Sequence, residues 1–377
     1  MRQKHFEAIK ALASEEAFNP GAYDINWQDP AELDAFVLLA EQGGVVSWCF
    51  HRLMQQGQGE QLPFLVARLK KRYLAILVDN QQRLQLYKHL KQLFGDNNIP
   101  FALLKGMALA FTVYPHEALR PMGDLDILVP ADKVLQARDL LIHNEARSTH
   151  VPISAWHEMH NAHVRPLVLP PYRYMIELHS KLYADGSYLL PKTAKWEDMV
   201  CQKNGPLGTF NVMSDPWLLY HLCTHLYHGY EMGGLRLGWL IDIARVLEQS
   251  DDVATMVRAT LAIHKPGRKA VLRALGWSAQ FTGYRVRESL KEWSSSFIQE
   301  PSIKLYMSAK GEEALHRYIV LRQLLHRRIV LQQLLHSGGL RNKVAGLWHQ
   351  VFPSREYMRH YFGEGPLWKQ HLRRLTS

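Results

Sequence analysis

The feature that most constrains the fold is a short apolar segment in which two aspartates alternate with large aliphatic residues. It reads DLDILV over residues 124–129 and is followed by Pro130. Because side chains alternate between the two faces of a strand, Asp124 and Asp126 would share one face. Neighbouring carboxylates repel each other unless a cation neutralises them, and a hard ion such as Mg²⁺ takes oxygen ligands. The segment therefore predicts a strand with a metal site on one face, although a lone pair of this kind also marks ordinary turns and strand ends.

The hydrophobic pattern around this segment changes from helical to mixed and back to helical. Up to about residue 94 the apolar residues recur at helical spacing, with a helix over 79–94 expected to end near Gly95, and the helical pattern resumes from Asp215. Between these parts we expect a buried strand at residues 99–104 and helices at 105–114 and 131–144. A pair of strands is expected at 163–169 and 172–179. The prediction is an α+β chain with an N-terminal helical region (1–95), an α/β core (96–200) and a C-terminal helical domain with a basic tail (201–377).

Three further positions have the chemistry to extend a site at the two aspartates. Gly106 opens a helix, whose free N–H groups favour an anion such as phosphate, and Lys105 beside it adds a positive charge. Gly123 lets the chain approach a ligand closely. Glu177, in the apolar strand YMIELH, is a candidate third carboxylate, although an ordinary solvent-facing glutamate fits the same pattern. His179 shares the strand face of Glu177 and is a candidate contact for the bound nucleotide.

The order of these motifs resembles the DNA polymerase β-like nucleotidyltransferase superfamily. More closely, LLKGMAL, YPHEALRPMGDLDILV and the later E-L-H strand resemble a large bacterial family of uncharacterised nucleotidyltransferases. Further matches to that family are the H-x-x-x-H helix at 221–225 and the R-L-x-W-x-x-D-x-x segment at 236–244. The resemblance implies a polymerase β-like core, a small mixed sheet with flanking helices. One departure is Met107, which stands where the superfamily usually has the serine of a Gly-Ser turn.

The resemblance implies a cofactor and a reaction. Two Mg²⁺ ions, or Mn²⁺, held by Asp124, Asp126 and Glu177 would bridge an NTP such as ATP and a hydroxyl acceptor, and an NMP would be transferred with loss of pyrophosphate. Lys105, Gly106 and Gly123 would lie against the nucleotide. The expected acceptor is a small molecule or a glycan precursor. The alternatives are tRNA or a protein, as in toxin-type transferases, and a catalytically silent nucleotide-binding scaffold.

Two charged residues outside the strands have both a functional and a structural interpretation. Arg120, four residues before Asp124, either steadies the triphosphate or forms a structural ion pair. Asp242 lies in an apolar helix and needs a partner there, for which Arg245 or Arg236 is available; its functional alternative is a base that deprotonates the acceptor.

Three histidines follow one face of a predicted helix, at positions 221, 225 and 228. An unbroken helix cannot easily wrap three ligands around one zinc ion. We therefore expect a polar stripe along a cleft or a set of hydrogen-bonded core histidines.

Charge and cysteine content bear on partners and compartment. The formal net charge is +10, and residues 317–377 carry eleven Lys/Arg against two Glu, a net +9. This segment is either a solvated helical face or a site for RNA or an acidic partner. The three cysteines lack CxxC spacing, and the sequence shows no apolar leader and no membrane-spanning run. This combination predicts a reduced cytoplasmic protein.

Overall fold

The computed structural model describes most of the chain up to residue 297. The described ranges are 2–14, 17–148, 160–191, 194–205, 208–231 and 234–297, with isolated residues outside them. The basic segment 317–377 therefore lies outside the described residues apart from single positions, and its role stays a prediction. Two compact units make up the chain: Met1–Gln85, Leu104–Met122 and Thr193–Leu325 form the first, and Leu86–Leu103, Gly123–Lys192 and His326–Ser377 form the second. These units are discontinuous in sequence, whereas the predicted division is into three consecutive parts.

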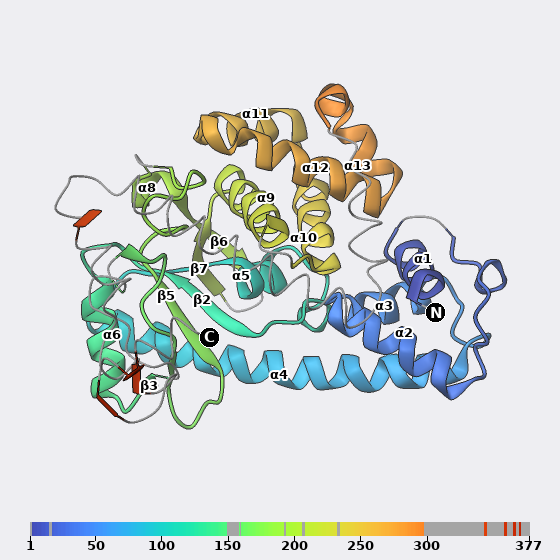
Figure 1. The fold of residues 1–377 in the computed structure, drawn as a ribbon, viewed down its shortest axis with the longest axis horizontal. Coiled ribbons are helices and arrows are strands. Elements are labelled where there is room, and N and C mark those ends of the chain that lie inside the picture. Colours follow the sequence, from blue (N-terminus) through green and yellow to red (C-terminus); the bar gives the residue numbers. More distant parts are fainter. Residues whose placement is uncertain are drawn as a thin grey trace. The chain divides into compact units, whose positions relative to one another are not determined.

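The second unit contains a small mixed sheet in the order β3-β4-β5-β2-β1. The strands are β1 (Ala102–Leu103), β2 (Asp124–Leu128), β3 (Arg147–Ser148), β4 (Leu167–Val168) and β5 (Met175–His179). β2 and β5 pair in parallel, and the β1–β2, β3–β4 and β4–β5 pairs are antiparallel. A parallel pair requires a long crossover connection, and helix α6 (Val134–His143) lies in it. Figure 1 shows β2 and β5 side by side, with α6 beside them.

The apolar face of the two central strands forms the core of this unit. Leu125 and Ile127 of β2, and Ile176 and Leu178 of β5, have no exposed surface. They alternate with the polar residues of the same strands, so the period of two fixes which face is buried. The predicted strands at 99–104 and 124–129, the strand pair at 163–179 and the helix at 131–144 are all confirmed, with shorter bounds for the first strand and the strand pair.

The first unit is mainly helical. Its helices are α1 (Arg2–Ala13), α2 (Pro30–Gln42), α3 (Val46–Gln55), α5 (Lys105–Thr112), α8 (Trp196–Met199), α9 (Asp215–Glu231), α10 (Leu237–Glu248), α11 (Val253–Ile263), α12 (Arg268–Thr282) and α13 (Tyr284–Ser289). It also contains the antiparallel pair β6 (Val200–Gly205) and β7 (Gly208–Met213), which the sequence analysis misses. α9 packs against α11 and α12 (Figure 1), and the buried Trp277 of α12 stacks on Tyr227 of α9 at 6.1 Å between ring centroids.

Helix α4 (Pro63–Asp96) is longer than expected, because the predicted helix over 79–94 is only its second half. The chain leaves it at Asn98, which has a φ of 53°, a left-handed conformation that asparagine tolerates at helix ends. The predicted α+β fold class, a small mixed sheet with flanking helices, is confirmed. No individual helix of the described ranges has both the length and the apolar character for a membrane span, and α2 with α3, bent by 115°, meets those criteria only as a pair.

A close backbone approach within the first unit depends on a glycine. Gly238, near the start of α10, donates its N–H to the carbonyl oxygen of Gly43 over 2.9 Å, in the turn between α2 and α3. A Cβ at position 238 would lie 2.8 Å from the carbonyl oxygen of Gly44, well inside normal contact distance. A side chain here therefore requires the turn and α10 to move apart.

We predict that Gly238→Ala lowers the free energy of unfolding by about 1–3 kcal/mol, the usual range for overpacking. The matched control is Gly95→Ala in the last turn of α4, where a Cβ meets no atom within 4 Å. Alanine is the better helix former there, so stability stays equal or rises by up to about 1 kcal/mol. Urea denaturation of both variants measures the difference, and equal effects of the two changes would contradict the close approach.

Candidate functional site

The parallel register of β2 and β5 brings polar side chains from distant parts of the sequence to one sheet face. Asp126 pairs with Glu177, and Leu128 pairs with His179. Paired residues of neighbouring strands point to the same side of a sheet, and so do residues two apart on one strand. Asp126, Glu177 and His179 therefore share the face opposite to the apolar core.

These three side chains are close enough to hold one metal ion. The Nε2 atom of His179 lies 3.0 Å from Oδ1 of Asp126 and 3.5 Å from Oε2 of Glu177. One ligand atom from each residue lies within 4.8 Å of the other two, and within the described part of the chain no other trio of His, Cys, Asp or Glu does so. Asp126 and His179 are 5% and 4% exposed, and Glu177 is half-buried. A buried and a half-buried carboxylate beside an imidazole form a donor set that fits a divalent cation.

The polar neighbours of Glu177 lower the pKa of its carboxyl group. Burial by itself raises the pKa of this carboxyl group, but the hydrogen bond from His179 and the positive charge available on His163 outweigh it. The pKa of Glu177 therefore lies below its ordinary value. The carboxylate is ionised at neutral pH and can act as a ligand.

Asp124 lies on the same face as Asp126, two residues earlier, at the start of β2. It pairs with Met175 of β5 and is half-buried. The trio of Asp126, Glu177 and His179 does not include it, so the role of Asp124 as a metal ligand stays a prediction. Gly123, just before it, has open space where a Cβ would be, so packing within the described structure does not require glycine there.

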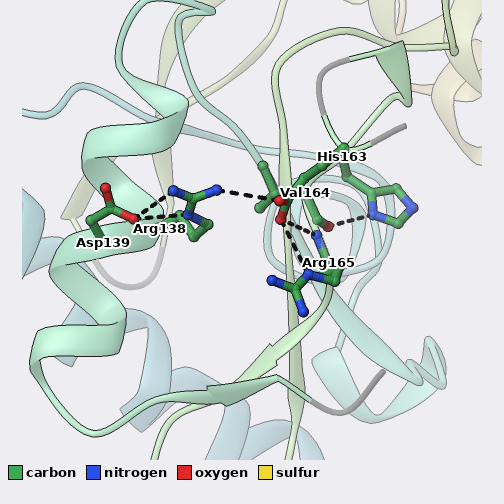
Figure 2. A network of polar contacts seen from close by, with 6 residues as sticks. Arg138, Asp139, His163, Val164 and Arg165 are labelled. Carbon is green, nitrogen blue, oxygen red and sulfur yellow. Dashed lines mark hydrogen bonds and ion pairs between the residues drawn. The ribbon is translucent and has the colours of Figure 1, made fainter. Parts of the chain in front are cut away.

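A network of polar contacts anchors the segment that carries His163, a residue next to the site that the sequence analysis did not single out (Figure 2). Arg138 of α6 contacts Glu158 over 3.3 Å, and Arg165 contacts the same carboxylate over 3.4 Å. Val164 donates its N–H to the carbonyl oxygen of Leu178 over 3.0 Å. His163 is thereby fixed beside β5, with Nε2 3.8 Å from Oε2 of Glu177.

The predicted phosphate-binding turn has the expected local structure. α5 begins at Lys105, which has a φ of 39°, and its first turn includes Gly106. A Cβ at Gly106 would lie 2.9 Å from Cγ of Met122, so packing alone already favours glycine at this position. Phosphate binding by Lys105 and Gly106 stays a prediction.

Arg120 and Asp242 form a structural ion pair with each other. Nε of Arg120 lies 2.8 Å from Oδ1 of Asp242, and Nη2 lies 2.8 Å from Oδ2. The hydroxyl of Tyr114 donates to Oδ1 over 2.8 Å, and Asp242 has no exposed surface. Burial and the charge of Asp242 raise the pKa of Tyr114 well above its usual value, so this phenol remains a neutral donor.

This pair corrects the expected partner of Asp242. The partner of Asp242 is Arg120, whereas Arg245 pairs with Glu248 and Arg236 lies over the ring of Trp239. For Arg120 and Asp242 the geometry supports the structural interpretation over triphosphate binding and acceptor deprotonation, because each group already satisfies the charge of the other. Sequence spacing gave no sign that residues 122 positions apart would meet.

The three histidines of α9 lie among aromatic neighbours. The His225 ring is 6.0 Å from that of His221 and 4.7 Å from that of Trp239. His221 is buried, and burial lowers the pKa of His228. His225 and His228 are half-buried, and whether the three histidines form a polar stripe along a cleft or a set of core histidines stays a prediction.

Comparison with known proteins gives a family match over most of the chain. A family model described as "Uncharacterised nucleotidyltransferase" matches residues 29–283, more than half of the chain. The search of curated proteins finds no match. Among solved structures, an antigenic nucleotidyltransferase-like protein from Paracoccidioides brasiliensis matches with 13% identity and a TM-score of 0.28, covering 54% of this chain and 92% of that one. A score this low carries no argument about the fold.

We predict that Asp242→Ala lowers the free energy of unfolding by about 3–5 kcal/mol, because it leaves the Arg120 guanidinium, 13% exposed, without its counter-charge. Chemical denaturation measures the loss. The control is Arg258→Ala, which removes an ion pair with Glu292 whose two side chains are both more than half exposed, and which should leave stability nearly unchanged. Similar effects of the two variants would show that the buried pair is not structurally important.

Proposed function

Because the chain belongs to the family of uncharacterised nucleotidyltransferases, we propose that it transfers an NMP from an NTP to a hydroxyl acceptor at the β2–β5 face. The observation that carries the proposal is the convergence of Asp126 and Glu177, 51 residues apart in the sequence, at adjacent register positions beside His179. Burying two carboxylates side by side is unfavourable unless a positive charge neutralises them. A divalent ion bound for catalysis would supply this positive charge.

In the proposed reaction the acceptor oxygen forms a bond to the α-phosphorus. The bond between that phosphorus and the oxygen bridging to the β-phosphate breaks, pyrophosphate leaves with the bonding electrons, and the hydroxyl proton passes to solvent. Divalent ions bound at this site, Mg²⁺ or Mn²⁺, would neutralise charge on the entering and leaving oxygens. Asp126 and Glu177 would hold them, with Asp124 on the same face as a further oxygen donor.

Nucleotide binding is proposed for the start of α5 and for the turn before β2. Lys105 and the N–H groups at the start of α5 would take phosphate oxygens. Gly123 would let the chain lie against the ligand. Arg120 is not part of this proposal, since its guanidinium is committed to Asp242.

The preferred acceptor is a small molecule or a glycan precursor. The alternative is tRNA or protein, and the charge of +9 on residues 317–377 supports it, because a basic segment attracts anionic macromolecules. Incubation with each α-labelled NTP and a divalent ion, with and without total tRNA, separates the two: label on acid-precipitable material indicates a macromolecule, and label on acid-soluble products indicates a small acceptor.

We predict that Asp126→Asn and Glu177→Gln each abolish label transfer while the protein stays folded, since each change removes a ligand charge but keeps the side-chain shape. Asp132→Asn, an exposed position before α6, should keep full activity. Transfer assays and thermal unfolding on the same preparations measure both effects. Full activity in either site variant would overturn the proposed site. Nucleotide binding by the unaltered protein without any label transfer, with either ion, would favour the silent nucleotide-binding scaffold.

A further inference from the structure

An imidazole lies between the two carboxylates of the site. Two ligands that are each about 2.1 Å from an ion lie about 3.0 Å apart at a right angle and about 3.4 Å apart at a tetrahedral angle. Nε2 of His179 is 3.0 Å from the Asp126 oxygen and 3.5 Å from the Glu177 oxygen. These separations are those of neighbouring ligands on one ion.

Strand pairing fixes the backbone of His179. His179 ends β5, its carbonyl oxygen accepts the N–H of Val129 over 2.8 Å, and an isolated bridge joins it to His163. The residue is 4% exposed. A buried side chain fixed by strand pairing is preorganised as a ligand, since little entropy is lost when the ion binds.

A second imidazole faces the same carboxylate. Nδ1 of His163 lies 2.8 Å from the carbonyl oxygen of Val164. A carbonyl oxygen only accepts, so Nδ1 carries a proton, and in the imidazolium form Nε2 carries a second proton that a carboxylate can accept. That atom lies 3.8 Å from Oε2 of Glu177, and the two rings are 5.0 Å apart. A ring nitrogen held by a backbone carbonyl is the arrangement common in histidines of metal centres.

We propose that His179 is a nitrogen ligand of the ion held by Asp126 and Glu177, and that the site therefore selects Mn²⁺ over Mg²⁺. His163 acts as a positioning residue for Glu177. The selectivity follows from the donors, because Mg²⁺ strongly prefers oxygen ligands and retained water, whereas transition ions accept imidazole readily. This inference rests on the proposed function for the presence of an ion, and it concerns only which ion and which ligands.

The test measures binding of Mn²⁺ to the full-length protein by electron paramagnetic resonance, with Mg²⁺ added as competitor. Half-displacement of Mn²⁺ should need at least a tenfold excess of Mg²⁺, and pulsed spectra should show coupling to a ¹⁴N nucleus. His179→Asp replaces the nitrogen by an oxygen, so the coupling should disappear and the selectivity should fall about tenfold. His179→Asn serves as a second variant if the first does not fold, and His143→Asn, exposed at the end of α6, is the matched control.

His163→Ala should keep the ¹⁴N coupling and weaken Mn²⁺ binding about tenfold, as expected for a residue that orients a ligand. Coupling that survives in His179→Asp but is lost in His163→Ala would overturn the assignment of His179. Mn²⁺ bound without ¹⁴N coupling, or equal selectivity in the protein and its His179 variants, would overturn it as well. In those cases loss of transfer in Asp126→Asn would still support the proposed function, whereas absence of any divalent-ion binding would contradict both.

Discussion

The candidate site depends on the parallel pairing of β2 with β5. Its register sets Asp126 directly beside Glu177 and brings His179 to the same face, while Leu125 and Ile176 are buried on the other. A slip of one residue in either strand would turn its polar residues into the core, so the apolar face and the site are specified together. The free energy gained by burying the aliphatic side chains thus holds the carboxylates together against their mutual repulsion.

The segment that leads into β2 is held by polar contacts within the first unit. Arg120 is fixed by its side chain to Asp242 and by its backbone carbonyl, which accepts a hydrogen bond from the buried Asn80 over 3.0 Å. Asn80 also donates to the carbonyl oxygen of Glu117 over 2.8 Å. Buried polar groups of this kind are stable because each has a partner, and they restrain the chain four residues before the first aspartate.

Much of the fold was predictable from short-range patterns, since strand alternation and helix periodicity are local properties of the chain. The alternation in DLDILV and YMIELH correctly placed Asp126, Glu177 and His179 on polar strand faces. The register between the strands, the pairing of Arg120 with Asp242 and the place of His163 beside Glu177 were not predictable, because they depend on contacts between distant residues. The β6–β7 pair was missed because residues 200–213 combine polar residues and glycines without a clear alternation.

The central claim is that Asp126 and Glu177 hold a divalent ion against the tail of a nucleotide. A crystal structure of the protein with Mn²⁺ and a non-hydrolysable NTP, with the ion located by anomalous scattering, tests it most directly. We expect an anomalous peak at about 2.0–2.3 Å from an oxygen of each carboxylate, with phosphate oxygens completing the coordination. A peak elsewhere, or a lysine or arginine side chain filling the space between the two carboxylates in the nucleotide complex, would contradict the account.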